Sequence, residues 1–222
     1  MRFFITLMLL TASMTAFAQT QALSQLVYEL RNPKTNPANF RQTLETIGEY
    51  LARQLQENLI TKEVTVNTLT GVKARSRLIN ETPTLVTILR AGLPLNAGVQ
   101  KVFPNAEVGF IAMSRDEKTF AAKVEYVAFP DIKNKTVILA DTMLATGGSI
   151  IDALKIIEEY KPKQIFVIAA VASKPGIERI AKYNPNIKIF AAVVDPRLND
   201  KGYIIPGLGD AGDRAYGKKK VT

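Results

Sequence analysis

The spacing of apolar residues near the start of the chain predicts a long amphipathic helix. Asn36 or Asn39 is a plausible N-cap for this helix, and Pro37 suits an early helical position. The apolar positions, three or four residues apart, are Phe40, Leu44, Ile47, Leu51, Leu55 and Leu59. This spacing places them on one face of a helix, and we expect that face to pack against the core.

A short hairpin around Thr70-Gly71 is predicted within 64–72. After it, short apolar runs alternate with amphipathic segments. The runs predict strands over 84–89, 108–113, 136–140, 165–171 and 187–194, and the segments predict helices over 93–102, 149–160 and 174–183. Residues 114–135 are predicted to be a long polar connection. Strands alternating with helices imply right-handed crossovers, so the predicted fold is α/β, with a mainly parallel sheet flanked by helices.

Charged residues lie at or just past the ends of these predicted strands. They are Arg90, Arg115, Asp141 and Asp195. In open α/β sheets, ligands bind beyond the carboxyl ends of the strands, so we expect the functional site at that edge.

The run from Ile138 to Ile150, ILADTMLATGGSI, is the most informative part of the chain. An apolar strand ends at Asp141, small residues rich in hydrogen-bond donors follow, and a helix begins near Ser149. Unpaired N–H groups and the helix dipole favour an anion at a helix N-terminus. No Lys follows the glycines, so the run is not a Walker A sequence, and it is not G-x-G-x-x-G.

We interpret residues 145–149 as a phosphate-binding loop. Asp141 is then a candidate contact for a sugar diol or for a metal held by the phosphates. The alternative is a tight strand-to-helix turn with Ser149 as its N-cap and no ligand.

Composition limits the chemistry that these residues can perform. Among 222 residues, 47% are apolar, which is enough for a core, and there is neither cysteine nor histidine. Disulfides, zinc–thiolate sites, cysteine nucleophiles and Ser-His-Asp catalysis are therefore excluded. The net charge of +9 suits anionic partners, and the run Lys218-Lys219-Lys220 is predicted to be a solvated tail. No dense Arg–aromatic patch is visible, which argues against nucleic-acid binding.

Residues 1–18 do not resemble part of a folded domain, and we predict one domain over 19–222. An apolar stretch after Arg2 ends in Ala16-Phe17-Ala18, which resembles the cleavage site of a secretory signal, and it is too short to span a membrane comfortably. The alternative is an over-extended start, with translation from Met14.

The segment 202–217, GYIIPGLGDAGDRAYG, is too glycine-rich for the interior of a helix or sheet. Loops of this composition in a compact domain usually hold the backbone in a specific shape around a ligand. A flexible terminal arm is the alternative. The apolar residues Tyr203, Ile204, Ile205 and Leu208 favour docking instead.

Four colinear segments together resemble the uracil phosphoribosyltransferase family. They are 87–93 (TILRAGL), 113–117 (MSRDE), 140–149 (ADTMLATGGS) and 202–213 (GYIIPGLGDAGD). The resemblance implies a type I phosphoribosyltransferase fold with a small hood near the base site. It also implies a reaction of uracil with 5-phosphoribosyl 1-pyrophosphate that gives UMP and pyrophosphate. Mg²⁺ would be held mainly by the substrate, with no direct protein ligand set.

The resemblance also implies roles for individual residues. Asp141, Arg115 and Asp210 would be catalytic. Phosphoribosyl pyrophosphate would contact Arg90, Arg115, Asp141, Thr142, Met143, Leu144, Ala145, Thr146, Gly147, Gly148, Ser149 and Asp210. Uracil would contact Ile204, Gly209, Asp210 and Ala211, largely through their backbone groups. Residues 116–130 would be a mobile flap.

Three positions depart from the common family pattern, namely Pro94, Ser114 and Thr142, and we expect Thr142 to affect the ribose side of the site. The resemblance implies a cytoplasmic enzyme and a homo-oligomer, with GTP as a candidate effector and no membrane partner. Export is the alternative that the N-terminus suggests.

Two other functions stay open. One is a uracil- or nucleotide-sensing RNA-binding regulator on the same fold, and the other is a phosphoribosyltransferase for another base.

Overall fold

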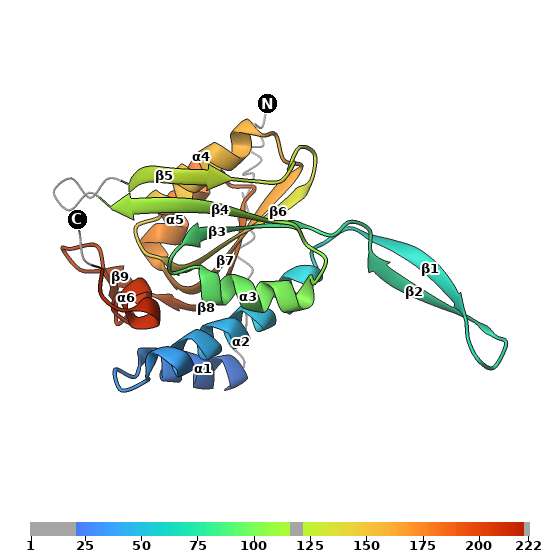
Figure 1. Cartoon of the computed structure of the whole chain (residues 1–222), viewed down its shortest axis with the longest axis horizontal. Helices are drawn as coiled ribbons and strands as arrows, with labels where there is room; N and C mark the ends of the chain where they lie inside the picture. The colour runs from blue at the N-terminus through green and yellow to red at the C-terminus, as the bar shows by residue number, and fades with distance from the viewer. Residues whose placement is uncertain (1–20, 116–121, 220–222) are drawn as a thin grey trace, which may run out of the picture.

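A computed structural model describes residues 21–115 and 122–219. The predicted signal-like segment 1–18 lies outside the described residues. Within the described part, a six-stranded sheet has the order β5-β4-β3-β6-β7-β8, parallel except for β5 (Figure 1). Its strands are β3 (Thr84–Leu89), β4 (Val108–Arg115), β5 (Ala122–Ala128), β6 (Thr136–Leu144), β7 (Gln164–Ser173) and β8 (Lys188–Asp195). The predicted α/β class with a mainly parallel sheet is confirmed.

Alternate side chains of the central strands enter two separate cores. In β6, Ile138 belongs to one apolar cluster and Leu139 to the other, and in β7 Phe166 and Val167 divide in the same way. All four side chains are fully buried. Because both faces of the sheet are covered, its central strands are continuous apolar runs, as is typical of parallel sheets.

Helices cover the two faces of the sheet (Figure 1). One cluster contains buried residues of α1 (Gln21–Arg31), α2 (Pro37–Gln56) and α3 (Leu93–Val102). The other contains those of α4 (Gly148–Glu159) and α5 (Lys174–Tyr183). The predicted capping of α2 is confirmed for Asn36, whose Oδ1 accepts a hydrogen bond from Asn39 N at 2.9 Å, with Pro37 in the first turn.

Helices α2 and α3 pack unusually closely where two glycines meet. A Cβ atom at Gly98 would lie 1.8 Å from the carbonyl oxygen of Glu45, and one at Gly48 would lie 2.1 Å from that of Leu95. The backbones therefore touch directly, and no larger residue fits at either position without separating the helices.

A hairpin of β1 (Thr61–Asn67) and β2 (Lys73–Ile79) projects from the body of the molecule (Figure 1). The two strands are antiparallel, and Val64 lies opposite Ser76. The hairpin predicted around Thr70-Gly71 is confirmed, and it is longer than the expected 64–72. Most of its side chains are exposed.

The predicted polar connection over 114–135 is wrong in its middle, because 122–128 form the edge strand β5. This strand pairs antiparallel with β4, and its exposed side chains include Lys123 and Tyr126. An edge strand with a solvent-facing side needs no apolar run, which explains why polar residues concealed it. Residues 116–121 of the predicted flap lie outside the described residues.

Two boundaries also differ from the predictions. Strand β6 continues past the predicted end at 140 to Leu144, because Met143 and Leu144 still pair with Val171 and Ala172 of β7. The segment 202–217, predicted to lack regular structure, contains the two-residue strand β10 (Ile204–Ile205) and helix α6 (Ala211–Tyr216). Strand β10 pairs with β9 (Arg197–Leu198), and these elements lie beside the carboxyl ends of β3 and β4, where a small hood is expected (Figure 1).

Helix α2, with 20 residues, is the longest helix that the structure describes. Within 21–115 and 122–219, no helix combines the length and the apolar character needed to cross a membrane.

Replacing Gly98 with Ala should destabilise the protein by about 1–3 kcal/mol or more, because the added methyl group overlaps the backbone of α2. Urea denaturation followed by circular dichroism measures the change in unfolding free energy. Gln42→Ala, at an exposed position of α2, is the matched control and should stay within about 0.5 kcal/mol of the parent chain. Equal stability of the two variants would contradict the close contact between the helices.

Candidate active site

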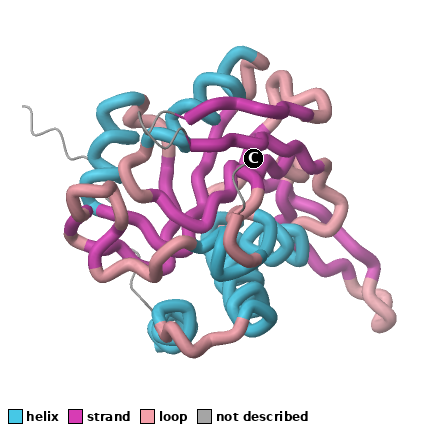
Figure 2. The backbone as a smooth tube through the Cα atoms, turned by 60° about the vertical axis from the view of Figure 1, so that its left-hand side comes forward, coloured by secondary structure: helices cyan, strands magenta, loops and turns pink. Residues whose placement is uncertain are grey.

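A cavity of about 430 Å³ lies at the carboxyl ends of β3, β4 and β6. Residues at the ends of these strands form one side of it, and residues of the segment 202–212 form the other. Figure 2 turns this end of the molecule forward and shows the loops that connect the strands to the helices there. The cavity is therefore where the parallel topology predicts a ligand site.

Most of the predicted site residues meet in this cavity. Those that line it are Arg90, Asp141, Met143, Ala145, Ser149, Ile204, Gly209, Asp210 and Ala211. Residues far apart in the sequence are thus brought together, from the first predicted motif at 87–93 to the last at 202–213.

Of the other predicted residues, those whose side chains the structure describes do not line the cavity. Thr142 and Leu144 are fully buried, and the Thr142 hydroxyl donates to the carbonyl oxygen of Ala91 at 2.6 Å. Thr146, Gly147 and Gly148 belong to the loop behind Ala145 and Ser149. For Arg115, the structure describes the backbone at the end of β4 and leaves the side chain outside the described part.

The loop 145–149 enters α4 through a left-handed residue. Gly147 has a φ of 78° and is the N-cap residue of α4, which begins at Gly148, so Ser149 is not the N-cap that the alternative of a ligand-free turn assigned to it. A φ in this region favours glycine over any residue with a Cβ atom. Ser149 instead lies exposed in the first turn, where helical N–H groups have no intrahelical acceptor. These groups are available to an anion.

Buried and partly exposed polar groups hold this loop from the side of α5. Ser173 is fully buried; its Oγ donates to the carbonyl oxygen of Ala145 at 2.6 Å and accepts from Gly176 N at 2.9 Å. Arg179 Nη1 donates to the carbonyl oxygen of Thr146 at 3.2 Å. Neither residue was identified from the sequence, because nothing local to Ser173 or Arg179 indicates contact with a loop some 30 residues earlier.

Asp141 is 9% exposed within the sheet, at the wall of the cavity. Burial raises the pKa of its carboxyl group to about 7, and hydrogen bonds from the backbone N–H groups of Thr142 and Met143 act in the opposite direction. A ligand that offers hydroxyl donors or a cation would stabilise the charged form of this carboxylate, because such a ligand replaces the lost hydration.

The segment that follows β3 is tied to the end of the chain. Arg90 Nη2 lies 3.4 Å from Asp213 Oδ1 and donates to the carbonyl oxygen of Gly217 at 3.3 Å. Asp210 is the N-cap of α6, and its Oδ1 accepts from Asp213 N at 2.8 Å. Thus Arg90 and Asp210, both predicted to bind phosphoribosyl pyrophosphate, line the same cavity although they are far apart in the sequence.

Nine further residues line the cavity that the sequence did not identify as ligand contacts, among them Met113, Tyr203 and Lys219. The run 218–220 was predicted to be a solvated tail, and Lys219 is indeed exposed, but it also borders the cavity. Lys219 therefore adds a second positive charge to the lining of the cavity, in addition to Arg90. Charge alone, without the path of the backbone after α6, could not distinguish Lys219 from Lys218.

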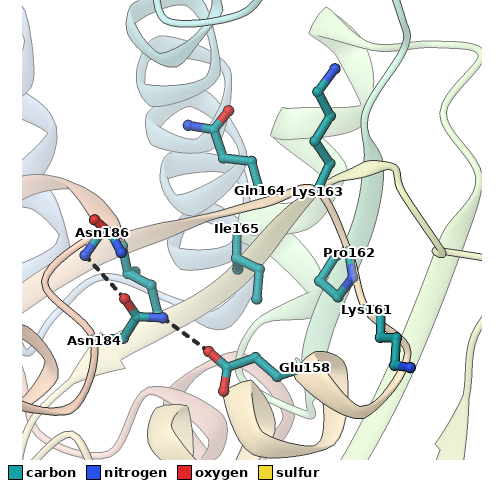
Figure 3. A pocket seen from close by; sticks show the side chains of 9 residues that line it. Glu158, Lys161, Pro162, Lys163, Gln164, Ile165, Asn184 and Asn186 are labelled. Atoms are coloured by element: carbon teal, nitrogen blue, oxygen red, sulfur yellow. Dashed lines mark hydrogen bonds between the residues drawn. The ribbon is translucent and has the colours of Figure 1, made fainter.

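A second, larger cavity of about 530 Å³ lies at the opposite end of the sheet, where β7 begins (Figure 3). It contains none of the predicted site residues. Its acidic group, Glu158, is already engaged, because Tyr183 Oη and Asn184 Nδ2 donate to its two oxygens at 2.5 and 3.1 Å. We therefore place the chemistry in the cavity at the carboxyl ends of the strands.

Comparisons with known proteins show similarity over most of the chain. The uracil phosphoribosyltransferase family model matches residues 17–218. The uracil phosphoribosyltransferase of Dictyoglomus thermophilum is 41% identical over 192 residues, which are 86% of this chain and 93% of that protein. That of Thermococcus gammatolerans is 38% identical over 207 residues, 91% of this chain and 92% of that protein.

A solved structure supports the same relation. The AQ2163 protein from Aquifex aeolicus has 37% sequence identity and a TM-score of 0.84, over 90% of this chain and 96% of that chain. Sequence similarity therefore extends over the sheet, the loop 145–149 and the segment 202–213 together. The chain belongs to the uracil phosphoribosyltransferase family.

Proposed function

We propose that this chain transfers the ribosyl 5-phosphate group of 5-phosphoribosyl 1-pyrophosphate to uracil, giving UMP and pyrophosphate in a salvage reaction. The observation that carries the proposal is the single cavity shared by Asp141, Ser149 and the segment from Ile204 to Ala211. A sugar phosphate suits the first part, and a pyrimidine suits the second, where backbone groups are the available hydrogen-bonding partners.

The reaction breaks the bond between the anomeric carbon and a pyrophosphate oxygen and forms a bond from that carbon to N1 of uracil. The N1 proton passes to solvent, and pyrophosphate leaves with the bonding electron pair. N–H groups of the loop 145–149 bind the 5-phosphate, and the Asp141 carboxylate faces the ribose hydroxyls. Arg90 and Lys219 supply positive charge for the departing pyrophosphate, where charge-assisted hydrogen bonds strengthen as charge develops.

Magnesium fits the acidic groups of the cavity. Within the described residues, no group of three or more His, Cys, Asp or Glu side chains could enclose a metal ion. Asp141 and Asp210 are the carboxylates that line the cavity, and Mg²⁺ typically uses one or two carboxylates together with waters and substrate oxygens. When bound, the ion would neutralise charge on the pyrophosphate, and Asp141 and Asp210 would orient it.

Regulation and assembly extend the proposal beyond the cavity. GTP as an effector, a homo-oligomer and a cytoplasmic location stay predictions of the family resemblance. Titration of the activity with GTP tests the effector, and sedimentation velocity of the purified chain tests the homo-oligomer. N-terminal sequencing of the native protein tests the location, because it distinguishes export from an over-extended start.

The purified protein should form UMP from labelled uracil and phosphoribosyl pyrophosphate, and chelation of Mg²⁺ should abolish the product. Hypoxanthine and guanine, as alternative acceptors, should give none. Product from these purines would identify a transferase for another base. Salt-sensitive RNA retention without UMP would instead support the regulator.

Replacing Asp141 with Asn should lower turnover by roughly tenfold to a hundredfold, because a charge-assisted contact is lost.

The same change, Asp141→Asn, should stabilise the unliganded protein at high pH. The pKa of Asp141 rises on folding from 3.8 to about 7, so the folded state holds the extra proton and stability falls as pH rises through this window. Asn does not titrate, and the stability advantage of the variant should therefore grow as pH rises from 3.8 to about 7 in urea denaturation and level off above that. A pH-independent difference would contradict the buried carboxyl.

Replacing Ser173 with Ala should raise the KM for phosphoribosyl pyrophosphate several-fold and leave the KM for uracil nearly unchanged. The change removes the hydrogen bond that holds Ala145 and the cap of α5, so about 1 kcal/mol of stability is lost as well. Steady-state kinetics and thermal unfolding measure the two effects. Thr68→Ala, which removes a hydroxyl bonded to the Val72 carbonyl in the distant hairpin, is the matched control and should not alter either KM.

A further inference from the structure

The segment that lines the uracil side of the cavity is held from beneath by a buried carboxylate. Asp195, the last residue of β8, is 3% exposed, and it does not line the cavity. Its Oδ2 accepts a hydrogen bond from Gly207 N at 2.9 Å. Gly207 is itself buried, and it lies between Ile204 and Gly209, which do line the cavity.

The other oxygen of Asp195 is paired with the first helix. Arg31, the last residue of α1, donates from Nη2 to Asp195 Oδ1 at 2.6 Å. The Asp195 carboxylate thus joins α1, β8 and the segment after β10 through two hydrogen bonds, both of them charge-assisted. Arg31 and Asp195 are 164 residues apart along the chain, whereas Gly207 follows Asp195 by 12 residues.

A second arginine ties the same segment to α1 from the other side. Arg214 of α6 donates from Nη1 to the carbonyl oxygens of Leu30 and of Leu208, the latter at 3.1 Å, and from Nη2 to that of Asn32 at 2.7 Å. Its guanidinium lies 4.3 Å from the centre of the Phe40 ring. The end of α1 is therefore held in place by Arg214, and Asp195 connects it to Gly207 through its hydrogen bonds to Arg31 and to Gly207 N.

One oxygen of Asp195 accepts a hydrogen bond from a main-chain N–H group of the predicted base-binding segment. If that oxygen were removed, a buried N–H group would lose its partner, and the backbone would have to move to find another. Such a movement would displace Ile204 and Gly209, whose backbone groups are expected to bind uracil.

We propose that Asp195, oriented by Arg31, is a positioning residue that sets the backbone of 204–209 for recognition of the pyrimidine base. This inference rests on the proposed function for the identity of the base. Ser173 and Asp195 lie opposite each other in the ladder of β7 and β8, but their side chains bond to different halves of the site. Ser173 bonds to the loop 145–149, which Arg179 also holds, whereas Asp195 bonds to Gly207 and Arg31.

The two substrates therefore provide a specific test. Asp195→Ala should raise the KM for uracil by about tenfold to a hundredfold, the range that corresponds to one charge-assisted hydrogen bond, and leave the KM for phosphoribosyl pyrophosphate nearly unchanged. Asp195→Asn keeps an acceptor oxygen for Gly207 N and should recover part of the uracil affinity. Arg31→Ala should give a smaller rise, because Asp195 keeps its bond to Gly207.

The matched control is Glu107→Gln, which breaks an ion pair between Glu107 Oε2 and Lys135 Nζ, 2.6 Å apart, at the opposite end of the sheet. This variant should keep both KM values. An Asp195→Ala enzyme that raises both KM values equally, or neither, would overturn the proposal. If Asp195→Ala shows no cooperative thermal transition, Asp195→Asn and Arg31→Ala replace it in the test. A rise in the KM for uracil alone, relative to Glu107→Gln, then supports the proposal, and equal changes in both KM values, or no change in either, overturn it.

Amide hydrogen exchange measured by NMR without substrates gives a readout that does not depend on catalysis. The amide of Gly207 should be protected in the parent chain and in Glu107→Gln, and it should exchange faster in Asp195→Ala. Absence of UMP from the parent chain would reject the proposed function, whereas an active enzyme whose Gly207 amide exchanges equally fast with and without Asp195 would reject this inference alone.

Discussion

The burial of strand β6 between β3 and β7 is the constraint on which the site depends. Thr84 to Thr87 of β3 pair with one edge of β6, and β7 pairs with the other along nearly its whole length. This double pairing fixes the register, and a slip by one residue would exchange the faces of Asp141 and Thr142. In the observed register Asp141 reaches the cavity wall, and Thr142 is buried with its hydroxyl bonded to the Ala91 carbonyl.

The same burial sets the electrostatics of the cavity. Desolvation in the sheet raises the pKa of Asp141 to about 7, so the carboxyl group is poised to be ionised by a cationic or hydroxyl-rich ligand. A chain without histidine or cysteine cannot use the usual neutral-pH proton shuttles or thiolate nucleophiles. Positioned backbone groups and fixed charges are what remain, and they suit a reaction in which a good leaving group departs from a sugar.

Loop positions around the cavity are held by polar contacts that arrive from elsewhere in the chain. Ser173 holds the loop at Ala145, and Asp195 holds the segment at Gly207. Both side chains are almost completely buried, and both bond to main-chain atoms. Their contribution is therefore to fix backbone geometry, which matters most where backbone groups are the expected ligand contacts.

The sequence determined the elements whose signal is local. Apolar spacing located α2 and the central strands, and the small residues after Asp141 located the phosphate-type loop, because helix and strand periodicities are properties of neighbouring residues. Tertiary structure alone decided the rest. The edge strand β5 depends on pairing with β4, the extension of β6 depends on β7, and the roles of Ser173, Asp195 and Lys219 depend on which distant segments fold against them. Hydrogen bonds and cavities formed between segments that are not neighbours in the sequence leave no periodic trace in it, and only the packed chain reveals them.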